Sequence, residues 1–125
     1  MAPHTNPAAP RRTLAALASY LLLAAAALVP RLLGRGRFIT DDEANFWLRR
    51  SDIFLNALRS GDYLQTAITT HPGVTTMWLG AGGIVLRRVL LASGWLASEA
   101  FPTILATMRL PVVLAHAAAL LLGYV

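Results

Sequence analysis

Acidic side chains gather in one polar stretch of this 125-residue chain, residues 34–71, which holds five of its six acidic residues. Three of them are consecutive: Asp41, Asp42 and Glu43. A positioned carboxylate can remove a proton from a hydroxyl group while that hydroxyl attacks a carbon atom. Because consecutive helical residues point in different directions, at most one of the three would act as such a base.

The same acids also fit the beginning of a helix. Residues Thr40 to Glu43 have the spacing of a capping box, in which the Thr40 hydroxyl accepts from the amide of Glu43 and the Glu43 carboxylate accepts from the amide of Thr40. Acids in a first turn also suit the positive end of the helix dipole. Capping and catalysis are compatible, so both interpretations remain open for these residues.

The composition predicts that most of the chain lies in lipid. Hydrophobic residues make up 56% and charged residues only 14% of the chain, whereas soluble domains carry about 25% charged residues. The net charge of +5 comes from arginines in short clusters between apolar runs, which is typical of membrane flanks and not of a nucleic-acid-binding surface. The absence of cysteine excludes disulfides, cysteine-ligated zinc and thiol catalysis.

A hydrocarbon core takes about 20 apolar helical residues. Of three apolar runs, the first supplies this length, the second is interrupted by Arg87 and Arg88, which would lie near the far interface, and the third is entered at Arg109. We therefore expect an all-α integral membrane protein. Its expected parts are a disordered cytoplasmic tail (1–12), spans at 13–33, 72–97 and 109–125, a loop at 34–71 with an interfacial amphipathic helix at about 41–60, and a short loop at 98–108. The last run is still apolar at Val125, so we expect it to be cut within a span.

Three local patterns refine these segments. A cleaved signal sequence, including a weak twin-arginine type at Arg11 and Arg12, is the alternative for the first run. That run exceeds the ~7 to 15 apolar residues of such a signal, which favours a retained helix. In the second span, residues 80–83 give a small-residue face suited to close helix packing. Gly61 is expected to end the interfacial helix.

His71 and Pro72 begin the second apolar run, where a helix N-terminus would offer free amides to a phosphate group. Arg35 and Arg37 lie in the same polar stretch and could add charge to that site. A lone histidine without a second ligand at a suitable spacing does not predict a metal site. His116, inside the third apolar run, is expected to be a polar group packed between helices.

The order of three short motifs resembles the N-terminal region of GT-C type membrane glycosyltransferases, specifically the group of protein mannosyltransferases and aminoarabinose transferases. The motifs are residues 40–44 with the Asp-Glu pair, residues 71–80 with His-Pro, and residues 108–111 with Arg-Leu-Pro. Gly73 departs from the pattern, since many members have a second proline there. The resemblance implies that Asp42 is the catalytic base. It also implies that Glu43 lies in the acceptor or donor site. Together with Asp41 and the candidate phosphate-binding residues His71, Arg35 and Arg37, Glu43 makes up the predicted substrate-binding set.

The family would move a sugar from a polyprenyl-phosphate carrier to a hydroxyl acceptor, without a cofactor, on the extracytoplasmic side of the plasma (inner) membrane. The resemblance also decides the orientation, because five arginines on one side against six on the other leave the positive-inside rule without a preference. Arg109 is counted there with the cytoplasmic group.

The alternative function is that of a membrane scaffold or transporter fragment without catalysis. An anchored extracytoplasmic binding module is disfavoured, because residues 34–71 contain too little apolar surface for a core of their own.

Overall fold

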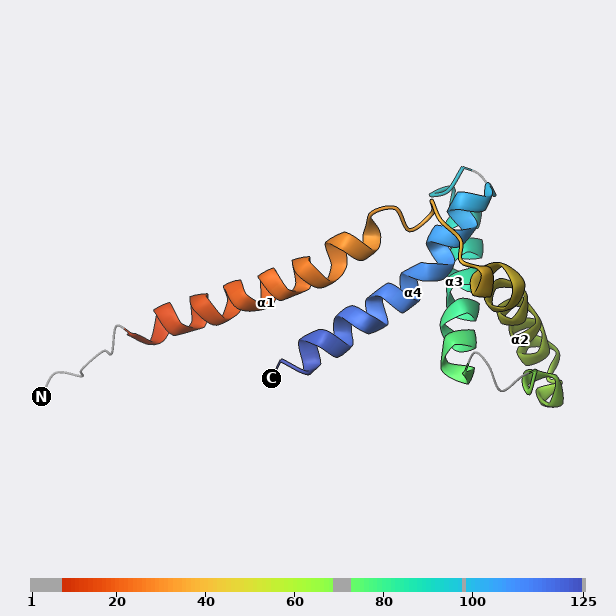
Figure 1. The fold of residues 1–125 in the computed structure, drawn as a ribbon, viewed down its shortest axis with the longest axis horizontal. Helices are drawn as coiled ribbons and strands as arrows, with labels where there is room; N and C mark the ends of the chain where they lie inside the picture. Colours follow the sequence, from red (N-terminus) through yellow and green to blue (C-terminus); the bar gives the residue numbers. More distant parts are fainter. Residues whose placement is uncertain (1–7, 69–72, 98, 125) are drawn as a thin grey trace, which may run out of the picture.

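The computed structural model describes residues 8–68, 73–97 and 99–124, with side chains from residue 13 onward, and these residues form helices and turns without a strand. Figure 1 shows the chain from the long first helix to the C-terminal helix. The elements are α1 (Ala8–Leu32), a π-helical turn η1 (Glu43–Trp47), α2 (Leu48–Ser60), a short 3-10 turn η2 (Tyr63–Thr66), α3 (Val74–Ala92) and α4 (Phe101–Leu122).

Three of these helices are long and apolar enough to cross a membrane: residues Thr13–Leu32 of α1, all of α3 and all of α4. The predicted all-helical membrane architecture is therefore confirmed at this level. The predicted helix over 41–60 also forms, as η1 followed directly by α2. Its last turn ends at Gly61, whose φ of 74° is left-handed and favours glycine.

Two predicted boundaries are wrong. Residues 8–12 belong to α1 and not to a disordered tail. The last helix begins at Phe101, eight residues before the predicted start at Arg109, because Pro102 fits the first turn of a helix and the residues that follow continue it. Pro111 consequently lies inside α4, where its ring removes a backbone hydrogen bond, and the helix bends in its middle (Figure 1). The predicted helix start at Pro72 lies outside the described residues.

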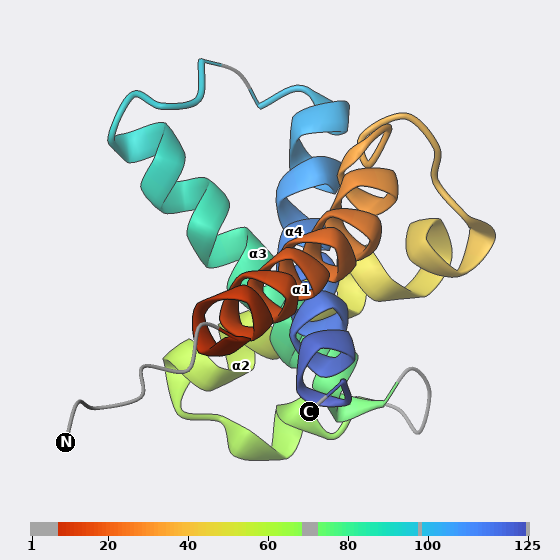
Figure 2. The same ribbon diagram turned by 90° about the vertical axis from the view of Figure 1, so that its left-hand side faces the viewer.

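Helices α1 and α4 contact each other and run in roughly opposite directions (Figure 1), and in the view of Figure 2 α1 passes obliquely in front of α4. Two contacts far apart on these helices fix this direction. The ring of Tyr20 packs edge-on against Tyr124 with centroids 5.3 Å apart, and Gly36, just after α1, lies against the backbone of Pro102 at the start of α4. At Gly36 a Cβ atom would be 2.6 Å from the Pro102 carbonyl oxygen, so the two segments meet backbone to backbone.

The glycines of α3 make close contacts on two sides, as their spacing predicted. A Cβ atom added to Gly80 would lie 2.1 Å from the Ser51 hydroxyl oxygen in α2, and one added to Gly83 would lie 2.4 Å from the Met108 Cα atom in α4. Helix α3 is therefore held between α2 and α4 by contacts that a larger residue would prevent.

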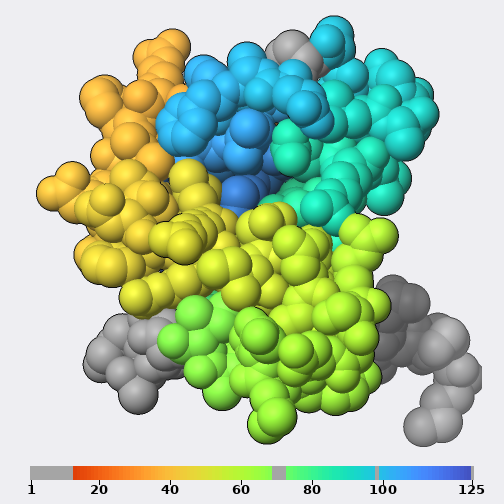
Figure 3. Space-filling model, turned by 90° about the vertical axis from the view of Figure 1, so that its right-hand side faces the viewer, coloured from red at the N-terminus to blue at the C-terminus, as the bar shows by residue number. Residues whose placement is uncertain are grey.

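Helix α2 packs against α3, and Figure 3 shows the face of the molecule on which it lies, with parts of α3 and α4 visible beside it. Its apolar side supplies Phe54 and Leu55 to a buried cluster that also contains Met77 of α3 and Met108 of α4. On its polar side, Asp52 pairs with Arg88 of α3 at 3.9 Å. The polar stretch between the first two long helices is thus packed against the helices and not separate from them.

The predicted division of the arginines between the two sides of the membrane is wrong for Arg109. Its guanidinium donates to main-chain oxygens of Arg35 and Phe38, so Arg109 lies next to the polar stretch that the sequence predicts on the opposite side. The reason is the way α4 packs: Pro102 at its start lies against Gly36, so the whole first half of α4, Arg109 included, runs beside the stretch that follows α1.

Candidate functional site

The centre of the site is an ion pair between Arg109 of α4 and Glu43 of η1, which are 66 residues apart in sequence. The Arg109 Nε atom donates to Glu43 Oε1 at 2.7 Å, and its Nη2 atom donates to Glu43 Oε2 at 2.5 Å. The side chains are 19% and 20% exposed. Such paired, charge-assisted bonds fix both the position and the orientation of the two groups.

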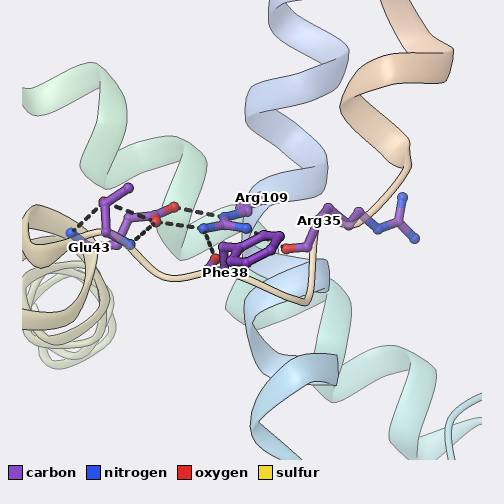
Figure 4. A network of polar contacts seen from close by, with 5 residues as sticks. Arg35, Phe38, Glu43 and Arg109 are labelled. Carbon is purple, nitrogen blue, oxygen red and sulfur yellow. Dashed lines mark hydrogen bonds and ion pairs between the residues drawn. The ribbon is translucent and has the colours of Figure 1, made fainter.

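Arg109 also holds the segment between α1 and η1. Its Nη1 atom donates to the Arg35 carbonyl oxygen at 2.6 Å, and Nη2 donates to the Phe38 carbonyl oxygen (Figure 4). One guanidinium group therefore connects α4, residues 35–38 and the beginning of η1.

Thr40 and Glu43 form the predicted capping box. The Glu43 amide donates to the Thr40 hydroxyl oxygen at 3.3 Å, and Glu43 Oε2 accepts from the Thr40 amide at 2.9 Å and from its hydroxyl at 3.0 Å. Both oxygens of Glu43 are thus engaged inside the protein. The Arg109 hydrogen bonds lower the pKa of Glu43 below its ordinary value of 4.5, with help from Thr40 and against the effect of partial burial.

Asp41 and Asp42 lie in the turn that this capping box begins, and both are exposed. Among the residues that the structure describes, neither carboxylate has a hydrogen-bond or ion-pair partner. Of the three consecutive acids, Glu43 alone therefore faces the helices, while the other two are open to a ligand or solvent. The different directions of Glu43 and its two neighbours agree with the expectation that consecutive helical residues point in different directions.

The π-helical turn connects the capping box to the core. Within η1, which spans Glu43–Trp47, the wider winding adds a residue to the turn, and such turns are frequent at functional sites. Trp47 at its end is 8% exposed and donates from Nε1 to the Thr76 carbonyl oxygen at 2.9 Å. That bond fixes the beginning of α2 to the first turn of α3.

A cavity of about 400 Å³ opens beside the ion pair, between α1, η1, α3 and α4. Its surface is mostly apolar. The residues around it that bear on function are Arg31, Glu43, Trp47, Arg109, Val113 and His116. Asp42 does not line this cavity.

The structure separates several of the other predicted site residues. Arg35 contributes its carbonyl oxygen to the Arg109 network, and its guanidinium points away from Glu43 in Figure 4. Arg37 is exposed and does not contact the network. His71 lies outside the described residues. His116 is exposed beside the cavity and is not packed between helices, which corrects the expectation for that residue.

Two basic residues of this region, Arg109 and Arg31, were not predicted as site residues. A charged side chain within an apolar run is costly unless it is paired, so Arg109 inside α4 could have indicated an acidic partner. Glu43 is the only acid it contacts in the described part of the chain. The described residues contain no group of three or more potential metal ligands.

Comparison of the chain with known protein families, curated proteins and solved structures finds no match.

Proposed function

We propose that the chain is the N-terminal part of a membrane glycosyltransferase of the GT-C type, which moves a sugar from a polyprenyl-phosphate carrier to a hydroxyl acceptor on the extracytoplasmic side of the membrane. The observation that supports this best is the Arg109–Glu43 pair. It brings together two of the three motifs on which the family resemblance rests, although 66 residues separate them.

We infer different roles for the two members of the Asp-Glu pair, and their surroundings support this. Glu43 is held by Arg109 and Thr40, so it acts as a positioning residue. Asp42, adjacent in the same turn and exposed, is the proposed catalytic base. It takes the proton of the acceptor hydroxyl as the hydroxyl oxygen attacks the anomeric carbon of the sugar. The bond from that carbon to the phosphate oxygen breaks, and the polyprenyl phosphate leaves with the electron pair.

The proposed activity can be tested in membranes from cells that make the product of the complete open reading frame. We expect labelled sugar to move from a polyprenyl-phosphate donor to a hydroxyl acceptor, and we expect a sugar nucleotide not to replace the lipid donor. Membranes containing the Asp42→Asn protein are the matched control. Transfer that is equal in both membrane preparations, or absent from both with every lipid-linked donor tried, would favour the scaffold or transporter alternative.

A further inference from the structure

The cavity beside the ion pair has the features of a binding site for an amphipathic ligand. It measures about 400 Å³ and combines apolar walls, including the Trp47 indole and Val113, with basic residues from two different helices. Ligand sites are typically of this kind, mostly apolar with a few polar groups that fix the orientation. Arg31 comes from the last turn of α1 and His116 from the second half of α4.

The charges around the cavity leave one cation free for a ligand. Arg109 and Glu43 compensate each other through two hydrogen bonds, and both oxygens of Glu43 are occupied. Arg31 uses its Nη1 atom to donate to the Ala27 carbonyl oxygen at 2.9 Å. Within the described residues its remaining N–H groups have no partner, and neither has the His116 ring. The cavity therefore has a net positive charge and two unused donors.

The position of these groups indicates what the ligand is. Arg31 and His116 belong to helices that are long and apolar enough to lie in a bilayer, so the amphipathic molecules around them are lipids. Two donors on separate helices fit a headgroup with several acceptor oxygens, and a phosphomonoester has three terminal ones. The apolar walls then take the first carbons of the attached chain.

We propose that this cavity binds a lipid phosphomonoester, with the phosphate at Arg31 and His116 and the beginning of the lipid chain against Trp47 and Val113. The inference rests on the proposed function for the identity of this lipid as polyprenyl phosphate, the phosphomonoester that leaves when the sugar is transferred, since the sugar-loaded donor is a phosphodiester. It moves the phosphate site from Arg35 and Arg37, where the sequence suggested it, to residues that the structure places around one cavity.

Tryptophan fluorescence provides the test, because Trp47 lines the cavity. Trp78 and Trp95 are replaced by phenylalanine, and the protein is placed in phosphatidylcholine nanodiscs. Brominated phosphatidic acid, a lipid phosphomonoester whose bromines quench indole at contact, is then added. We expect it to quench Trp47 at a lower membrane fraction than brominated phosphatidylcholine or the phosphodiester phosphatidylglycerol. Equal quenching by all three lipids would overturn the proposal.

Three substitutions separate specific binding from general surface charge. Arg31→Gln and, independently, His116→Gln should raise the half-quenching fraction, by about tenfold for the arginine because a charge-assisted hydrogen bond is lost. Arg59→Gln removes the same charge from an exposed position in the last turn of α2 and should have no effect. An equal shift in the Arg59 variant, or none in the Arg31 variant while its helical circular dichroism is unchanged, contradicts the site.

Two further measurements fix the ligand and its relation to catalysis. Inorganic phosphate at millimolar concentration should not reverse the quenching, because the lipid chain contributes to binding; complete reversal would indicate a site for free phosphate instead. Asp42→Asn should leave the quenching unchanged. Lipid binding without any sugar transfer would thus refute the proposed function alone, and sugar transfer without selective quenching would refute the cavity assignment alone.

Discussion

Breaking the Arg109–Glu43 pair should destabilise the fold by a measurable amount. Glu43→Gln removes the negative charge but keeps an oxygen that can complete the capping box. A hydrogen bond to a charged group contributes about 1.5 to 3 kcal/mol, and the pair has two of them with both side chains about four-fifths buried. In Glu43→Gln, Arg109 keeps its hydrogen bonds to the carbonyl oxygens of Arg35 and Phe38, which limits the loss. We therefore expect this substitution to lower the free energy of unfolding by about 2 to 3 kcal/mol.

The assay is denaturant unfolding in detergent micelles, followed by tryptophan fluorescence, for a double-mutant cycle with Arg109→Gln. We expect a coupling energy of about 1 to 2 kcal/mol between the two substitutions. Glu99→Gln is the matched control, because Glu99 pairs with Arg87 while its side chain is 72% exposed, and this change should cost less than about 0.5 kcal/mol. A coupling below about 0.5 kcal/mol would refute the idea that this pair holds η1 to α4.

Three further outcomes follow from the same structure. Because the folded state lowers the pKa of Glu43, the Glu43 carboxylate stabilises the fold fully above pH 4.5, and this stabilisation is lost as the pH falls through the lowered pKa. The free energy of unfolding, measured against pH, should therefore decline at acid pH in the unchanged protein, and this part of the decline should be absent in Glu43→Gln. Gly83→Ala should destabilise the protein by about 1 to 3 kcal/mol through its clash with Met108, whereas Gly82→Ala, whose Cβ would meet nothing nearer than 4.0 Å, should not; equal melting temperatures for the two variants would argue against the packing. Cysteine at the exposed Tyr63 should react with an impermeant thiol reagent in intact cells, and labelling only after lysis would invert the proposed orientation.

The features that the sequence predicted correctly depend on local rules. The capping box at Thr40, the glycine that ends α2 and the small-residue face of α3 each depend on residues within one or two turns. The three apolar helices follow from length and hydropathy alone. Because each of these features depends on residues at a fixed spacing along the chain, it can be predicted from a single sequence.

The features that the sequence missed depend on tertiary packing. The sequence predicts that the last helix starts at Arg109, because an arginine usually marks the edge of a span. In the structure Arg109 lies inside α4, where its long-range partner Glu43 compensates its charge. The predicted sides also separate Arg109 from residues 35–38, whose main-chain oxygens it binds, because the packing of α4 beside this stretch is a long-range contact. The sequence predicts that His116 is packed between helices, but in the structure it is exposed and lines the cavity, together with Arg31 of α1. No local sequence pattern predicts the direction in which α1 packs on α4.

The central claim is that Asp42 acts as the base while Glu43 only holds the turn in place. Turnover of Asp42→Asn in a sugar-transfer assay with the product of the full open reading frame tests it most directly, with Asp41→Asn as the neighbouring control. Asparagine suits the start of a helix as well as aspartate does but cannot take a proton at neutral pH. We expect turnover to fall by about 10² to 10⁴ fold in Asp42→Asn, with an unchanged melting temperature, and to remain near normal in Asp41→Asn. Near-normal turnover in Asp42→Asn, or a loss confined to Asp41→Asn, would contradict the account.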